Sequence, residues 1–146
     1  MLDKLTSLWS ARVLIILGFL AGYVPVGSTF EHIGNPSYSP THSWHHFFRE
    51  GFGDLGAMAA VLLIVFAAPQ YRTPVAWWVM LILMIGFYAP FWVGAPFMAE
   101  LAAPSMTAEI AHLRMAVPSL LGCFLAYRHF KPAAHALGYS GTISAL

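Results

Sequence analysis

Apolar residues gather into four long stretches, separated by short segments rich in proline, glycine and polar side chains. The stretches cover residues 8–26, 51–68, 74–93 and 108–127. One helix needs about 20 mostly apolar residues to cross the hydrocarbon core of a bilayer, and each stretch is close to that length. The pattern therefore predicts an all-α fold, an integral membrane four-helix bundle that forms a single domain over residues 1–146.

The ends of the predicted helices follow from the residues that flank the apolar stretches. Pro40 and Thr41 are typical of a helix start, with Thr41 as the N-cap, so the second helix is expected to begin ahead of its apolar part. Pro118 lies inside the last stretch and is expected to kink it. With these refinements, the four predicted spans cover residues 8–26, 42–68, 74–93 and 107–128.

The composition also favours a membrane protein. Apolar residues make up 59% of the chain and charged residues only 9%, whereas ordinary soluble domains carry about 25% charged residues. The single cysteine, Cys123, lies in an apolar stretch, which excludes a disulfide framework and predicts a packing role. A net charge of +1 gives no reason to expect a nucleic acid partner. No clear cleavage site follows the first stretch, so we expect it to be retained as a span.

Charged residues divide unequally between the two sides of the predicted bundle. Four spans place both termini and the 69–74 loop on one side, which carries Lys4, Arg12, Arg72, Arg128 and Lys131. The other side carries Glu31, Glu50, Asp54, Glu100 and Glu109, together with Arg49 and Arg114. Because basic residues favour the cytoplasmic side, both termini are predicted to be cytoplasmic. We expect the lipid bilayer to be a bacterial inner membrane.

Histidines crowd at the outer, periplasmic side of the predicted bundle. His32, His42, His45 and His46 all fall between the first two apolar stretches. Residues three and four apart share one face of a helix, so His42, His45, His46 and Arg49 are expected to line up at the start of the second span. This face is the part of the chain with the most evident capacity for chemistry.

Further ionisable residues enter the predicted membrane. Glu50 and Asp54 continue the same helix face from His46 towards the membrane. Glu109, His112 and Arg114 lie at the start of the fourth span. Such groups are costly in hydrocarbon unless they are paired, solvated or face a cavity. We therefore expect the second and fourth spans to aim these groups at one shared volume, with Arg114 as the counter-charge of Asp54.

A non-haem metal site is one chemistry that fits the cluster. The segment His42-Ser43-Trp44-His45-His46 matches one HxxHH box of membrane desaturases and hydroxylases, and Glu109-Ile110-Ala111-His112 matches the ExxH element of di-iron bundles. Both kinds of site need further copies of their motif. The metal would be iron or copper, with His46 as the first candidate ligand and His45, His112 and Glu109 as alternatives.

Two other interpretations fit the same histidine cluster. One is haem ligation by a single histidine, with neighbouring groups contacting the propionates or a substrate. The other assigns the rings no chemistry, because histidine, tryptophan and tyrosine are amphipathic and suit the headgroup level. In the third span, Gly86-Phe87-Tyr88 places a hydroxyl in the outer half of the membrane, among aromatic residues otherwise typical of packing.

The layout resembles styrene oxide isomerase, a family of small four-span membrane enzymes. The segment from Asn35 to His46 is similar to a segment found after the first span of other small four-span membrane proteins. In the isomerases the corresponding loop likewise ends in a histidine, which ligates haem. Gly86-Phe87-Tyr88 is similar to the Gly-Phe-Tyr that carries the family's active-site tyrosine. The resemblance covers the first three spans in order. It implies a homo-oligomer, a trimer that holds haem b between subunits, with His46 as the ligand and His45 as the near alternative.

The same resemblance implies a function and roles for particular residues. The protein would isomerise small hydrophobic epoxides to carbonyl compounds without net oxidation, with haem as the Lewis acid. Tyr88 and Asp54 would be catalytic and orient the substrate, although the family has an asparagine, at a different spacing, where Asp54 is the nearest match here. Haem would be bound by His46, His45, His42 and Arg49. The alternative is a non-catalytic metal- or haem-binding membrane subunit of a larger oxidase or monooxygenase complex.

Overall fold

The computed structural model describes residues 6–130, and within that range all regular structure is helical. The α-helices are α2 (Leu8–Ala21), α3 (Tyr23–Glu31), α4 (His42–Phe66), α5 (Pro74–Tyr88), α6 (Pro90–Gly94) and α7 (Met106–Ala126). Short 3-10 turns lie at Pro69–Tyr71, Ala99–Leu101 and Tyr127–His129. The predicted all-α class is therefore confirmed. Lys4 and Lys131, which contribute to the predicted charge asymmetry, lie outside the described residues.

The first predicted span forms two helices, and helical structure extends past its predicted end at Val26. The helix is interrupted at Gly22, between α2 and α3. Pro25 explains the position of the break, because a proline ring clashes with the carbonyl group four residues earlier, here that of Ala21. Helical structure then continues to Glu31, so this region reaches farther than the apolar pattern indicates.

The start of α4 differs in detail from the prediction. Thr41 does occupy the N-cap position, but its side chain makes no capping hydrogen bond, and its φ of 67° lies in the left-handed region. The predicted capping role of the Thr41 hydroxyl is therefore wrong. The backbone of this loop, which includes Gly34 at φ 85°, turns sharply before the helix begins.

Proline acts differently in the third and fourth spans. The third span is interrupted at Ala89, with α5 ending at Tyr88 and α6 beginning at Pro90, where the missing N–H is tolerated at a helix start. By contrast, α7 continues as one helix through Pro118.

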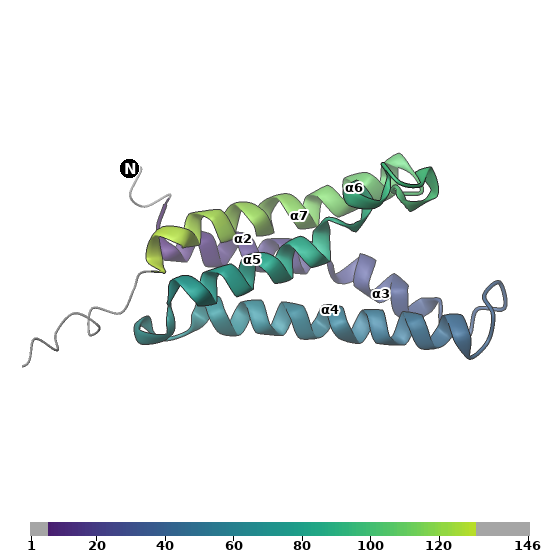
Figure 1. The fold of residues 1–146 in the computed structure, drawn as a ribbon, viewed down its shortest axis with the longest axis horizontal. Coiled ribbons are helices and arrows are strands. Elements are labelled where there is room, and N and C mark those ends of the chain that lie inside the picture. The colour runs from purple at the N-terminus through teal and green to yellow at the C-terminus, as the bar shows by residue number, and fades with distance from the viewer. Residues whose placement is uncertain (1–5, 131–146) are drawn as a thin grey trace, which may run out of the picture.

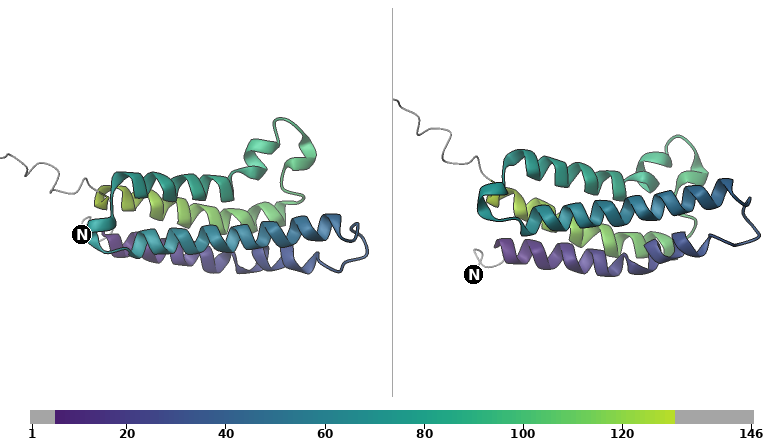
Figure 2. Two further views of the ribbon diagram at one scale, coloured as in Figure 1. Left: turned by 60° about the horizontal axis from the view of Figure 1, so that its bottom comes forward. Right: turned by 90° about the horizontal axis from the view of Figure 1, so that it is seen from below.

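The helices run along one long axis, as Figure 1 shows. The start of α2, the turn between α4 and α5 and the end of α7 lie at one end of the bundle, which we call the inner end. The loop before α4, α6 and the start of α7 lie at the outer end. In the left view of Figure 2, α4 runs close to α2 and α3, with α7 and α5 beyond them; α2 packs mainly against α7, and α4 packs mainly against α3 and α5.

Close packing between α2 and α7 forms the centre of the molecule. A Cβ atom added to Gly18 would lie 2.7 Å from the Met115 carbonyl oxygen, and one added to Gly122 would lie 2.7 Å from the Ala11 carbonyl oxygen. Glycines thus allow the two backbones to approach, as is common in membrane helix pairs. The core around this contact includes Ile15, Phe19, Val61, Val65, Trp77, Met80, Met84, Tyr88, Ala116, Cys123 and Ala126. The predicted packing role of Cys123 is confirmed, since its thiol is buried and unpaired.

Within residues 6–130, two helical runs are long and apolar enough to cross a membrane, Leu8–Glu31 and Met106–His129, each of 24 residues. The third apolar helix, α5, is shorter, with 15 residues. The 25 residues of α4 would suffice in length, but its first half carries Arg49, Glu50 and Asp54. The arrangement of all four predicted spans across a bilayer therefore stays a prediction.

Candidate functional site

The histidine face predicted from helical spacing is present at the outer end of α4. His42, His45 and His46 are all exposed, as is Arg49 one turn farther along. The ring centroids of His42 and His46 lie 4.7 Å apart, and those of His45 and His46 lie 6.1 Å apart. Three imidazoles and a guanidinium are therefore gathered on the first two turns of one helix, ahead of its apolar part.

His46 and Arg49 are joined directly. Nη2 of Arg49 donates a hydrogen bond of 3.0 Å to Nδ1 of His46. A neutral imidazole that accepts at Nδ1 carries its proton on Nε2. Neighbouring protein atoms displace part of the water around the ring, and the Arg49 charge lies close by. Both effects lower the pKa of His46 below its ordinary value and so favour the neutral form of the ring.

His32 does not join this face. Its ring lies 5.0 Å from that of Tyr38 and 4.9 Å from that of Phe47, measured between centroids. The ring centroids of Tyr38 and Phe47 are also 5.0 Å apart. His32 therefore belongs to an aromatic cluster through which the loop between α3 and α4 packs against α4.

The alternative ligands on α7 face in another direction. His112 is buried, and its Nε2 donates to the carbonyl oxygen of Tyr88 over 2.6 Å, because a carbonyl oxygen can only accept. Glu109 accepts a hydrogen bond of 2.9 Å from Nε1 of Trp92. Both side chains are thus directed to the α5–α6 segment rather than to α4.

The shared volume predicted between the second and fourth spans is not formed in a single chain. α3 lies against the outer part of α4, and α5 lies against its inner part. Among residues 6–130, no three histidine, cysteine, aspartate or glutamate side chains are placed to hold one metal ion. The described residues of a single chain therefore do not form a non-haem site with three protein ligands.

Tyr88 is fully buried at the end of α5. Its hydroxyl donates a hydrogen bond of 2.8 Å to Oγ of Ser119, which is also fully buried. The void next to the Tyr88 ring holds only about 10 Å³, roughly the space for one water molecule. Ala57 lines this void, and about 16 Å of helix separates it from His46 along α4. In this structure Tyr88 links two helices and does not meet the histidine face.

Asp54 is half-buried on α4, two turns beyond His46. Arg114, its predicted counter-charge, is exposed on α7. Within the described part of the chain, we find no ion pair between the two. The predicted pairing is therefore not seen, because the two helices on which these residues lie do not face each other at this level.

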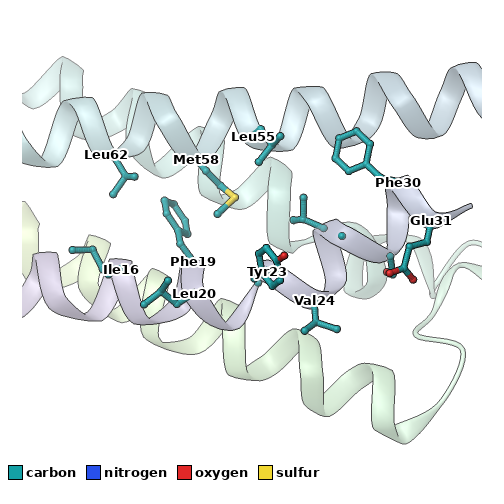
Figure 3. A pocket seen from close by; sticks show the side chains of 14 residues that line it. Ile16, Phe19, Leu20, Tyr23, Val24, Phe30, Glu31, Leu55, Met58 and Leu62 are labelled. Carbon is teal, nitrogen blue, oxygen red and sulfur yellow. The ribbon is translucent and has the colours of Figure 1, made fainter. Parts of the chain in front are cut away.

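A pocket that sequence reasoning missed lies between α2–α3 and α4, and Figure 3 shows it from close by. Its volume is about 820 Å³, within the range of small-molecule sites. The lining is almost entirely apolar and includes Phe19, Leu20, Leu55, Met58 and Leu62, with Tyr23 along it and Glu31 at its outer end. One sequence signal could have indicated it. The small residues Gly27 and Ser28 are adjacent in an otherwise bulky span, and a Cβ atom added to Gly27 would meet nothing within 4 Å.

Comparison of the chain with protein-family models, with curated proteins and with solved structures found no match.

Proposed function

We propose that the protein is an integral membrane protein whose helices cross the bilayer from the inner to the outer end of the bundle. Large apolar side chains are exposed along the lengths of the helices, among them Leu17, Leu63, Ile82 and Phe124. Soluble monomers rarely expose contiguous apolar surface on this scale, whereas lipid tails cover it readily. In this arrangement the hydrocarbon begins near Gly51 on α4, and the histidine face projects beyond it.

The distribution of charge sets the proposed orientation. Arg12 donates to the carbonyl oxygen of Val65 near the end of α4, and Arg128 donates to Oγ1 of Thr6, so both lie at the inner end. The acidic side chains Glu31, Glu50, Glu100 and Glu109 belong to segments at the outer end. By the positive-inside rule, the inner end and both termini face the cytoplasm.

The exposed histidine face is the observation that carries our proposal of haem b as cofactor. A haem iron needs only one or two protein ligands, whereas a non-haem site needs several around one ion. The described chain supplies exposed single imidazoles but no three-ligand cluster, so its donors fit haem better than bare iron or copper. A face open to solvent also suits a cofactor shared with a second copy, as in the trimer that the family resemblance implies.

Different residues of the histidine face would then bind different parts of the haem. His46 would bind the iron through Nε2, which requires its proton to move to Nδ1 and ends the hydrogen bond from Arg49. The released guanidinium would be available for a propionate carboxylate. His45 is the alternative ligand, and His42 lies close enough to His46 to contact the same group.

The proposed reaction is the isomerisation of a small hydrophobic epoxide to a carbonyl compound. Bound haem would supply a Lewis acid that withdraws electrons from the epoxide oxygen. The isomerisation would break one C–O bond of the epoxide and move a hydride to the neighbouring carbon, so it would need no external oxidant or reductant. Asp54, half-buried two turns from His46, is a carboxylate of α4 that lies beyond Gly51 and could orient a substrate from the membrane side.

The first experiment is an absorbance spectrum of the protein purified from membranes and loaded with haem. We expect a Soret band that His46→Ala abolishes and that His129→Ala, at the inner end, leaves unchanged. The loaded protein should convert an aryl epoxide to the aldehyde without consuming oxygen. Loss of the band in His45→Ala alone would move the ligand to His45, and an unaffected band in all three variants would rule out haem at this face.

One observation favours a second candidate, a non-catalytic haem- or metal-binding subunit of a larger oxidase or monooxygenase complex. The Tyr88 hydroxyl, the catalytic group that the resemblance implies, is fully buried and bonded to Ser119. A protein that is colourless alone, or that turns over no epoxide and co-purifies with redox subunits, would support this candidate.

A further inference from the structure

We infer that the pocket between α2–α3 and α4 is a lipid-binding slot for one acyl amphiphile with an ammonium headgroup. This inference rests on the proposed membrane location, but not on haem or on isomerase activity. The slot is the pocket of about 820 Å³ that runs from Ile16 and Leu62 to Glu31. Figure 3 shows its apolar side chains reaching from both sides into the space between the helices.

Contacts at both ends fix the width of the slot. At the inner end, Nε of Arg12 donates to the Val65 carbonyl oxygen over 3.1 Å and joins α2 to α4. At the outer end, the ring of Phe30 lies against Gly51, where an added Cβ would be only 2.5 Å from it. The centroids of Phe30 and Phe48 are 6.4 Å apart at the same place. The space between these contacts is therefore a closed-ended window and not an open groove.

The dimensions of this window fit an acyl chain better than a helix. From Ile16 to Glu31 the slot extends about 20 Å along the helices. A helix about 10 Å wide would fill about 1,600 Å³ over that length, twice the observed 820 Å³. One leaflet of the hydrocarbon core is about 15 Å thick, so a chain from the outer leaflet spans most of the slot. Insertion of a helix from a second copy of this protein would require the contacts at both ends of the slot to break.

The side of the slot is open where a lipid would enter. Leu20, Tyr23 and Val24 line it and are 67%, 80% and 73% exposed, so they form an edge directed away from the protein. At the outer end, Glu31 supplies the only carboxylate among the lining residues. Ser28 is already engaged, because its hydroxyl donates to the Pro25 carbonyl oxygen over 2.7 Å. A carboxylate at headgroup depth favours a cationic or hydrogen-bond-donating head.

Gly27 provides a way to fill the slot without disturbing the helices. It lines the slot, and an added Cβ meets nothing within 4 Å. Gly86, on the exposed face of α5, also has open space around it but does not line the slot, which makes Gly86→Phe the matched control for Gly27→Phe.

The test is native mass spectrometry of the full chain after reconstitution with phosphatidylethanolamine or phosphatidylglycerol and extraction in mild detergent. We expect one retained phosphatidylethanolamine per chain, about tenfold less in Gly27→Phe and no change in Gly86→Phe. Glu31→Gln should keep a bound lipid but reduce the preference for phosphatidylethanolamine by about threefold, as for one exposed charge pair. Equal retention in Gly27→Phe and the wild type would overturn the proposal.

A second measurement keeps the test decisive even where a variant folds poorly. A phospholipid with a photoreactive acyl chain should label wild-type α2, α3 and α4 at slot residues such as Leu20 and Met58, and labelling confined to other helices would refute the slot. A Gly27→Phe variant that changes oligomeric mass while lipid retention stays constant would show that a second copy occupies the space. Failure of the chain to remain in membranes after an alkaline wash would instead refute the membrane location.

Discussion

The two sides of α2 meet their neighbours in opposite ways. Towards α7, α2 packs backbone against backbone through Gly18 and Gly122. Towards α4 it is held by the Arg12 hydrogen bond at the inner end, and a slot of about 820 Å³ follows. Lipid tails are as apolar as leucine, so helices in a bilayer associate through close contact and polar links rather than through apolar burial alone. Glycine on both partners allows that contact, whereas the bulky side chains of Leu55, Met58 and Leu62 line the slot on the α4 side.

The largest effect is expected at the close contact between α2 and α7. Gly122→Leu places a side chain where even a Cβ would lie 2.7 Å from the Ala11 carbonyl oxygen and 2.8 Å from Ile15. We expect a loss of about 3 kcal/mol in the free energy of unfolding, at the upper end for overpacked cores. Unfolding by sodium dodecyl sulfate, followed by far-UV circular dichroism, measures it. Gly86→Leu is the control and should stay close to wild type.

The next effect concerns the link that closes the inner end of the slot. Arg12→Gln removes a charged donor to the Val65 carbonyl oxygen and the guanidinium that lies 4.7 Å from the centroid of the Phe66 ring. We expect a loss of about 2 kcal/mol. Arg72→Gln removes the same type of bond within a loop, since Nε of Arg72 donates to the Ala67 carbonyl oxygen. An equal loss in both variants would show that the Arg12 bond does not hold the helices together.

A smaller effect is expected at the polar link between α5 and α7. Tyr88→Phe removes the hydrogen bond to Ser119 and should lower stability by about 1 kcal/mol. In a double-mutant cycle with Ser119→Ala, the two losses should not add, because both remove the same bond. Additive losses would contradict this assignment. A drop in epoxide turnover far beyond the loss of folded protein would restore Tyr88 to the catalytic role implied by the family resemblance.

The smallest effect is expected on the side of α2 and α3 that lines the slot. Gly27→Leu makes the same chemical change as Gly122→Leu, but the added side chain enters the slot. We expect stability within about 0.5 kcal/mol of wild type, since leucine also favours the helix over glycine. The same detergent unfolding assay applies. A loss comparable to that of Gly122→Leu would mean that the slot closes in the membrane.

Much of the local structure was predictable from the sequence. The apolar stretches, together with the helix-start signal at Pro40 and Thr41, located most helix ends to within a few residues. The 3.6-residue period placed His42, His45, His46 and Arg49 on one face of α4. Short-range geometry decides both features. The ends were less predictable, because Pro25 breaks the first span at Gly22 and Thr41 takes a left-handed conformation that leaves its hydroxyl without a capping bond.

The environments of the candidate site residues were decided by the tertiary structure. A period along one helix defines which residues share a face, but it does not say which neighbour covers that face. Only the packed helices direct His112 to the Tyr88 carbonyl group, pair the Tyr88 hydroxyl with Ser119, and keep both away from the histidine face. The lipid slot arises in the same way. Gly18 and Gly122 allow α2 to approach α7 closely, and the slot remains on the side of α2 that faces α4.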